Sequence, residues 1–450
     1  MKRKILALVL ITLLVLSLCS CELIKKFSEP RDGISLWKCI DEKMGSLDSF
    51  TSNTTASISV TVDGVVVDGT VTGDSVVVGM KSGELSLYQF SSTEIKIAAT
   101  KTNQTSSSIV AYDNGNMYLF NKVDNNSKKL YSELSKEDFT TYFFEENSNF
   151  NISPEGCETV NFDKKDDGTW SLEYYGFSES DANEIACLMG FDPTTFGVVV
   201  DDVKVSATAN AEYLMTEINI KLIADEKTVF DSKITYSDFD SAVKKEFDKD
   251  SYIRVDDVRV VNDISSKMND ELNRESGDFI LKISHKLASK TGRISNSYLE
   301  TDTVSYGMKD GKYTYDISAV ASGQSIKMNY ADGKQEVYVG NRLSATNDQT
   351  DMEARTVVST LMNNAGYSPI YVTDVKKQDN GSFAVYCRTT DTSAYREIMS
   401  SCADTYQDYT LCFFATFDDN GDLKRLNCEL VIIGSKYDYT VETMLDIIKE

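Results

Sequence analysis

The sequence predicts an α+β fold made of two tandem repeats of a curved, half-barrel-like antiparallel sheet, each with an N-terminal helix and inserted lid helices. Two observations carry this prediction. Glycine-containing turn dipeptides separate short runs of alternating polar and apolar residues, and the chain repeats its own pattern after a little more than 200 residues. A period of that length is typical of a duplicated domain.

The strand prediction rests on alternation and on explicit turns. Asn-Gly and Asp-Gly dipeptides between alternating runs indicate β-hairpins, because glycine tolerates the positive φ that a tight turn needs. Alternating runs are found at 57–62, 94–97, 312–317 and 325–330, and turn dipeptides at 63–64, 82–83, 114–115, 167–168, 310–311, 332–333, 380–381 and 420–421.

The repeat is visible in three matched segments. Tyr112-Asp-Asn-Gly recurs as Tyr330-Ala-Asp-Gly at an offset of 218, and Ser153-Pro recurs as Ser368-Pro at 215. The segment from Phe162 to Trp170 matches 375–383 at an offset of 213. The offsets shrink slowly, as small loop deletions would make them.

Helices are expected at matching places in the two halves. They are predicted at 34–47 and 264–273, at 133–144 and 352–363, at 181–188 and 394–402, and at 238–247 and 441–448. The resulting division is a signal peptide (1–20), a lipidated tether (21–33), a first repeat domain (34–250), a strand-like connector (251–261) and a second repeat domain (262–450).

The N-terminus has the parts of an export signal. Three basic residues precede an apolar run of about fourteen residues, which spans roughly 21 Å as a helix, too short for a hydrocarbon core of about 30 Å. Leu18-Cys19-Ser20-Cys21 resembles the bacterial lipobox, in which the last cysteine is lipidated. Acyl chains such as palmitate on Cys21 would hold the mature chain at the extracytoplasmic face of a cell membrane.

Composition narrows the partners. Without residues 1–20, which carry three positive charges and no negative ones, the net charge moves from −24 to about −27. Such an acidic chain repels phosphate, so nucleic acid is excluded as a partner.

Seven cysteines follow Cys21, scattered without metal-binding spacing. One disulfide is proposed, between Cys412 and Cys428, if the hairpin between them has a three-residue loop. A slip of one residue would put the two on opposite faces.

No constellation of catalytic or metal-binding residues emerges, so we expect no enzyme, no cofactor and no metal. The only histidine, His285, lies in an alternating run and is read as structural. Ser241-Ala-Val-Lys244 and Lys290-Thr-Gly292 match two motifs of penicillin-binding enzymes but stand only about fifty residues apart, and coincidence is the better account. The aromatic runs 142–144 and 174–175 are read as core.

The order of elements in each half, preceded by a lipobox, resembles the family of periplasmic lipoprotein chaperones and mycobacterial lipid-binding lipoproteins. That resemblance implies a curved half-barrel, lidded by helices, that encloses an apolar cavity for acyl chains. Two functions stay open: a surface lipoprotein that binds a lipid or other hydrophobic ligand in an apolar groove, and an envelope scaffold or adhesion protein that binds a protein or polysaccharide. The ligand-binding residues are not identifiable at this level.

Overall fold

The computed structural model describes residues 29–62, 65–97, 102–145, 152–189, 191, 193, 198–272, 276–289, 294–309, 312–321, 323–363, 369–379, 382–388, 406–417, 423–435 and 437–448. The predicted lipidation site Cys21, the predicted helix at 394–402 and the turns at 63–64, 310–311, 380–381 and 420–421 lie outside these residues.

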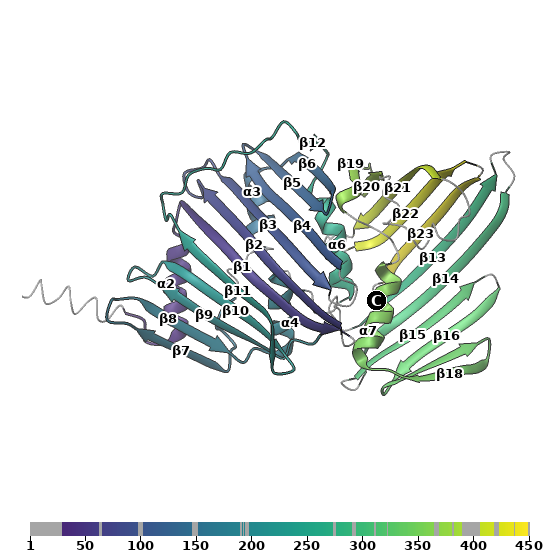
Figure 1. Ribbon diagram of the computed structural model, residues 1–450, viewed down its shortest axis with the longest axis horizontal. Helices are drawn as coiled ribbons and strands as arrows, with labels where there is room; N and C mark the ends of the chain where they lie inside the picture. The colour runs from purple at the N-terminus through teal and green to yellow at the C-terminus, as the bar shows by residue number, and fades with distance from the viewer. Residues whose placement is uncertain are drawn as a thin grey trace, which may run out of the picture.

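Two large sheets dominate the molecule and stand side by side in Figure 1. The first has the order β12-β6-β5-β4-β3-β2-β1-β11-β10-β9-β8-β7, and the second has the order β18-β17-β16-β15-β14-β13-β23-β22-β21-β20-β19. Apart from β12 at its edge, the first sheet therefore has the same order of successive strands as the second. Neighbouring strands pair antiparallel, except that β12 pairs parallel with β6.

The strands of the first sheet are β1 (Ser49–Val62), β2 (Val65–Val78), β3 (Ser86–Ile97), β4 (Thr102–Asp113), β5 (Asn116–Val123), β6 (Asn126–Glu133), β7 (Thr159–Lys164), β8 (Trp170–Tyr175), β9 (Asp202–Ala209), β10 (Met215–Ala224), β11 (Lys227–Ser237) and β12 (Ile253–Arg254). Those of the second are β13 (Ser276–Ser289), β14 (Ile294–Lys309), β15 (Lys312–Ala321), β16 (Gln324–Ala331), β17 (Lys334–Val339), β18 (Arg342–Asp348), β19 (Val372–Lys377), β20 (Phe383–Arg388), β21 (Tyr406–Phe417), β22 (Leu423–Gly434) and β23 (Tyr437–Ile448).

The helical elements are fewer and shorter. They are α2 (Gly33–Met44), α3 (Lys136–Thr140) continued by a π-helical turn η1 (Thr141–Glu145), α4 (Glu179–Leu188), α6 (Arg259–Leu272), α7 (Asp351–Asn363) and a 3-10 turn η3 (Pro369–Tyr371). Among the described residues, no helix is both long and apolar enough to cross a membrane.

The predicted α+β class is wrong, because the described part of the chain is mostly β, with 61% in strands and 14% in helices. The predicted helix 441–448 shows why. Its residues belong to β23, where Val441, Thr443, Leu445 and Ile447 alternate on the buried face. The same short apolar run satisfies a helical and a strand period, and pairing with β13 and β22 decides between them.

The predicted helix 238–247 is also wrong. Residues 238–252, called the strap from here on, run without helix or strand across the face of the first sheet that lies away from the main core. Phe247 packs against Tyr88 and Tyr118, with ring centroids 5.9 and 5.1 Å apart. Lys244 donates a 2.6 Å hydrogen bond to the buried carboxylate of Asp113, which Lys249 also contacts.

Several segments that match in sequence occupy matching places in the two sheets. Trp170 pairs with Lys164 next to the turn of the β7–β8 hairpin, and Phe383 pairs with Lys377 next to the turn of β19–β20. The β4–β5 turn has Asn114 at φ 49° and Gly115 at 75°, and the β16–β17 turn has Asp332 at 52° and Gly333 at 76°. Two successive positive φ values are those of a type I′ turn, as the dipeptides predicted.

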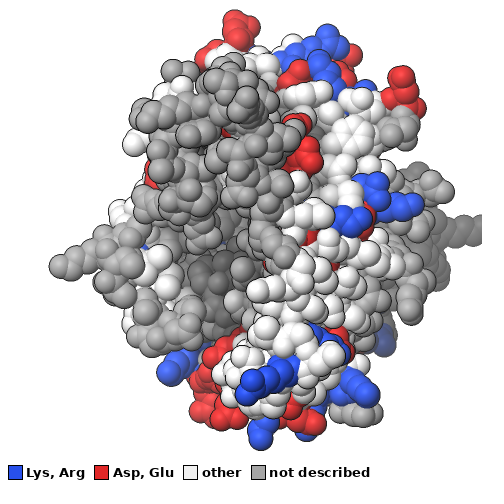
Figure 2. All heavy atoms as spheres, turned by 90° about the vertical axis from the view of Figure 1, so that its right-hand side faces the viewer, with Lys and Arg blue, Asp and Glu red and all other residues white. Residues whose placement is uncertain are grey.

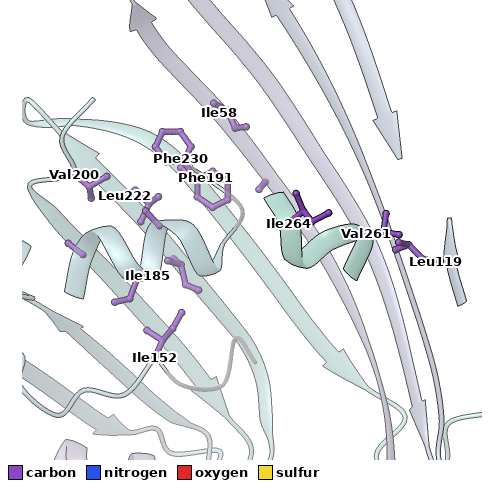
Figure 3. Packing of buried hydrophobic residues seen from close by; sticks show 14 of the residues in the cluster. Ile58, Leu119, Ile152, Ile185, Phe191, Val200, Leu222, Phe230, Val261 and Ile264 are labelled. Atoms are coloured by element: carbon purple, nitrogen blue, oxygen red, sulfur yellow. The ribbon is translucent and has the colours of Figure 1, made fainter. Parts of the chain in front are cut away.

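One connected hydrophobic core contains residues of both sheets and of the helices between them. We call the sheet faces that contribute to it the inner faces. In Figure 3, Val261 and Ile264 of α6 lie among side chains of the first sheet, including Leu119, and Ile185 of α4 lies near Leu222. The connector also joins the sheets directly, because Asp256 donates its backbone N–H to the carbonyl of Val375, at 3.1 Å.

Candidate functional site

The polar group that stands out in the core is Asp302, in the middle of β14. Its side chain is only 3% exposed, and its Oδ1 atom is buried without a hydrogen-bond partner. Burial, followed by the negative charge of Glu300, raises the pKa of this carboxyl from 3.8 to about 6. A buried polar group without a partner costs about 1–3 kcal/mol. Ser232 and Asn427 each have one such buried oxygen as well, but Asp302 is the acidic residue among the three.

The register of the second sheet places Asp302 in a cross-strand row that begins at the sheet edge and continues past Asp302 to Leu281 of β13. Directly paired residues share a face of a sheet, and Asp302 pairs with Ala319, Ala319 with Ile326, and Ile326 with Val339. Exposure rises along this row, from 8% at Ala319 through a half-buried Ile326 to 50% at Val339. The row therefore leads from solvent, near the sheet edge, to the buried carboxyl.

A second apolar row runs beside the first. Val304 and Ile317 are buried and paired, and Met328 and Val337 continue the row toward the edge as half-buried side chains. On the side away from Asp302, a row of tyrosines closes the face, with Tyr315 stacked on Tyr330 at 5.6 Å. These two rows and Asp302 are called the Asp302 face below.

Helix α7 fixes the closed side of this face. Its Ala354 and Val358 are buried, and Arg355 lies 4.4 Å above the ring of Tyr313. The hydroxyl of Tyr330 donates to Asp351 at 2.5 Å, at the start of the helix. The helix that follows β18 is therefore packed into the core at this place.

The corresponding row of the first sheet has a different chemistry. Tyr112 and Tyr330, matched in sequence, both donate to the carbonyl of the residue after the next hairpin, Leu134 at 3.2 Å and Gln349 at 3.3 Å. The strand pairings, followed from these two tyrosines, show that Gly73 of the first sheet occupies the position that Asp302 has in the second sheet. Its row continues with Ser91 and Ser108, whose hydroxyls are 2.7 Å apart, and then Asn121 and Lys128. Of these two matching rows, the one in the second sheet contains a buried acid and apolar side chains, whereas the one in the first sheet is polar.

The cysteine pairing proposed from sequence does not form. The register pairs Phe413 with Cys428 and Cys412 with Glu429, so the two cysteines lie on opposite faces, and both thiols are free. The bulge between Thr416 and Phe417 shifts the hairpin by one residue relative to the predicted pairing. Burial raises the pKa of the Cys387 and Cys428 thiols well above the ordinary value.

The other residues that the sequence analysis considered lie on different elements of the fold. His285 lies in β13, where its backbone pairs with Tyr298 and Val441. Lys244 holds the strap, and the segment 290–292 is outside the described residues. Tyr174 is buried and donates to the carbonyl of Ile152 at 2.7 Å. Within the described part of the chain, no group of three or more metal-ligating side chains is found.

Sequence reasoning did not identify Asp302. Its surroundings, Glu300-Thr-Asp302-Thr-Val304, read as an ordinary polar stretch with alternating residues. Asp302 shares a face of the strand with Val304 and Tyr306, because alternate residues of a strand point to the same side. This alternation can be seen in the sequence. The depth of burial, however, depends on neighbouring strands and helices that no local pattern specifies.

Comparisons with known proteins place the chain in no family. No family model matches, and no curated protein matches. Among solved structures, AttH of Nitrosomonas europaea is 6% identical with a TM-score of 0.13, and the alignment covers 88% of this chain and 92% of that one. A porin-like protein of Bacteroides uniformis is 7% identical with a TM-score of 0.11, covering 90% and 98%. Isotype 1 transferrin binding protein B of serogroup B Neisseria meningitidis is 8% identical with a TM-score of 0.14, covering 89% and 76%.

These neighbours, which include porin-like and β-barrel-like proteins, are distant from the present chain. At such low identities and TM-scores the likeness carries no argument about function.

Proposed function

We propose that this protein is a non-enzymatic surface lipoprotein, anchored to a membrane through lipid on Cys21, that binds a lipid or another hydrophobic ligand on the Asp302 face. The observation that supports this most strongly is the buried Oδ1 atom of Asp302, which has no hydrogen-bond partner and lies in the row that leads in from the sheet edge. An apolar surface with one placed polar group is the usual composition of a small-molecule site.

The polar end of the ligand follows from the charge of the site. Above pH 6 the carboxyl of Asp302 is mostly ionised, and an ionised carboxylate accepts hydrogen bonds but donates none. Glu300 adds further negative charge beside it. The ligand that fits is therefore hydrophobic, with an amine or other hydrogen-bond donor at its polar end, while its apolar part lies along Ile326 and Val339.

The test uses the mature chain from residue 21, with Cys21→Ser, exported behind a non-lipoprotein signal peptide and purified without detergent. Native mass spectrometry first asks whether lipid copurifies. Titration calorimetry then compares dodecylamine, dodecanol and dodecanoate at pH 7.5, below their micelle concentrations. We expect affinity to fall in that order.

Two variants and one control locate the binding. Asp302→Asn should weaken dodecylamine about tenfold or more and leave dodecanol nearly unchanged, because a charge-assisted hydrogen bond contributes about 1.5–3 kcal/mol. Val339→Asp should weaken all three. Asp316→Asn, on the opposite face of β15, is the matched control and should change none. Equal binding of the three probes, or none, would exclude the proposed site.

The alternative function is an envelope scaffold or adhesion protein that binds a protein or polysaccharide. The observation that favours it is the polar row of the first sheet, where Ser91, Ser108 and Asn121 are half-buried and present hydroxyl and amide groups. Two results together would favour this alternative function over lipid binding. No lipid would copurify with the chain, and calorimetry would show binding of an oligosaccharide that Ser108→Ala weakens.

A further inference from the structure

The strand β18 forms one edge of the second sheet, and no described strand pairs with its outer side. All seven of its residues are exposed, and Leu343 is 48% exposed. An edge strand presents a row of backbone N–H and C=O groups that can pair with another chain. Proteins usually protect such edges with internal charges, proline or a covering segment, but residues 343–347 include neither charge nor proline.

The first sheet covers the corresponding edge. There β6 occupies the place that β18 has in the second sheet, and β12 pairs with it in parallel through Ile253 and Arg254. Arg254 also forms an ion pair with Glu133 at 2.8 Å, which fastens the covering strand. The same position in the fold is therefore covered in one sheet and open in the other.

The sequence of β18 specifies its partner. It begins with Arg342, ends with Asp348 and is neutral between them. When two copies of such a strand pair antiparallel, Arg342 of each lies beside Asp348 of the other, whereas a parallel pairing brings like charges together. The neighbouring strand β17 also has no net charge, because it contains one basic residue, Lys334, and one acidic residue, Glu336.

This local neutrality matters in a chain with a net charge of −24. Two acidic molecules repel each other over most of their surfaces, so association is favoured where charges balance. Figure 2 views the molecule from the side of the second sheet, and acidic and basic side chains are mixed at its lower end, where β18 lies in Figure 1. A bulge between Val337 and Tyr338 leaves Ala345–Asp348 in regular register with β17.

We propose that β18 is a homodimerisation edge, at which two copies of this chain pair antiparallel and join their second sheets into one. Each copy contributes the seven residues of β18 to the interface. Because such an interface is small, the dimer is weak and its population depends on concentration. Leu343, which is in β18 itself, loses exposed apolar area when the strands meet. The proposal does not depend on the Asp302 ligand.

Charge reversal tests this pairing in the mature chain from residue 21 with Cys21→Ser. Sedimentation velocity from about 1 to about 500 µM should show wild-type mass rising toward that of a dimer. Arg342→Asp alone and Asp348→Arg alone should each weaken dimerisation about tenfold or more, since each places like charges at both ends of the paired strands.

An equimolar mixture of the two variants should restore dimerisation, because every Asp of one chain then meets an Arg of the other. A fluorophore on one variant distinguishes mixed from self-paired dimers. Lys227→Asp changes an exposed residue at the start of β11 in the first sheet, matches the charge change of Arg342→Asp and should have no effect. Circular dichroism checks that all variants fold.

A wild-type chain that stays monomeric over this range would overturn the proposal. A dimer that both single variants retain would overturn it equally, because the contact would then lie elsewhere. Failure of the mixture to recover dimerisation would exclude antiparallel pairing of β18.

Discussion

The ammonium group of Lys244 lies 2.6 Å from the carboxylate of Asp113, and this contact holds the strap across the outer face of the first sheet. Asp113 is buried, and it also accepts from Lys249. The matched residue of the second repeat is Ala331, which is exposed. The outer aromatic residues Tyr88 and Tyr118 likewise have polar counterparts, Asp316 and Glu336, by the strand pairings. The strap is therefore a feature of the first repeat alone among the described residues.

Replacing Asp113 should release the strap. Asp113→Ala leaves two lysines without their shared partner, and we expect it to lower the free energy of unfolding by about 2–3 kcal/mol. Hydrogen exchange should rise selectively in residues 238–252. Asp74→Ala is the control and should cost less than about 1 kcal/mol, because the carboxylate of Asp74 is more exposed and, among the described residues, forms an ion pair with Lys245 alone.

The stability difference between wild type and Asp113→Ala should depend on pH. Burial raises the pKa of Asp113, but hydrogen bonds from Lys244 and Lys249 outweigh it and lower the pKa below 3.8. A carboxyl with a lowered folded-state pKa stabilises the fold above its unfolded-state pKa, and this stabilisation is lost as pH falls through the folded-state value. The difference between wild type and Asp113→Ala should therefore shrink below about pH 4. A difference that is constant from pH 7 to pH 3 would contradict the ion-pair account.

For Asp302 we expect the opposite dependence of folding stability on pH. Its pKa is raised, to about 6, so the folded chain holds the proton more tightly than the unfolded chain. The stabilisation is complete below the ordinary pKa of 3.8 and is lost as pH rises through about 6. Asp302→Asn should therefore be more stable than the ligand-free wild type at pH 7.5, by about 1–3 kcal/mol, and the gap should close near pH 4. Urea unfolding at both pH values measures it, and a destabilised Asn variant at pH 7.5 would be inconsistent with an unpartnered carboxylate.

The two matched tyrosines allow a paired experiment. Tyr330→Phe removes hydrogen bonds to Asp351 and to the carbonyl of Gln349, and we expect a loss of about 1.5–3 kcal/mol. Tyr112→Phe removes a single bond to a neutral carbonyl and should cost about 0.5–1.5 kcal/mol. Chemical denaturation compares the two, and a larger loss at Tyr112 would show that the bond to Asp351 contributes little.

Thiol labelling tests the register of the β21–β22 hairpin. Cys387 and Cys428 are buried and their thiol pKa values are raised, so neither should react with iodoacetamide in the folded protein at pH 8. In denaturant without reductant, Cys412 and Cys428 should both be alkylated, as peptide mass spectrometry would show. A peptide pair joined by a disulfide would mean that the hairpin has the register first proposed from sequence.

The anchor is tested in cells. Cys21→Ser should abolish labelling of the chain by radioactive palmitate and release it from the membrane fraction, because no acyl chain would then hold it. Cys19→Ser is the matched control and should leave labelling and fractionation unchanged. Palmitate incorporation that persists in Cys21→Ser would place the modification at another residue.

The sequence by itself determined much of the local structure of this protein. The Asn114-Gly115 and Asp332-Gly333 dipeptides predicted hairpin turns, and both turns have the positive φ values that those residues tolerate. The amphipathic pattern after Gly33 predicted the first helix, which begins at an Asp32 cap and buries Leu36 and Ile40. These features depend on conformational preferences of neighbouring residues, and such preferences are present in the sequence.

The tertiary structure decided what local patterns leave open. Residues 441–448 have apolar side chains at both helical and strand spacing, and only pairing with β13 and β22 makes them a strand. The one-residue shift that separates Cys412 from Cys428 arises in the same way from a bulge. The burial of Asp302 depends on strands and helices distant in the sequence, and burial shifts the pKa of a carboxyl. A local pattern specifies which side chains share a face, whereas the depth of that face depends on the whole fold.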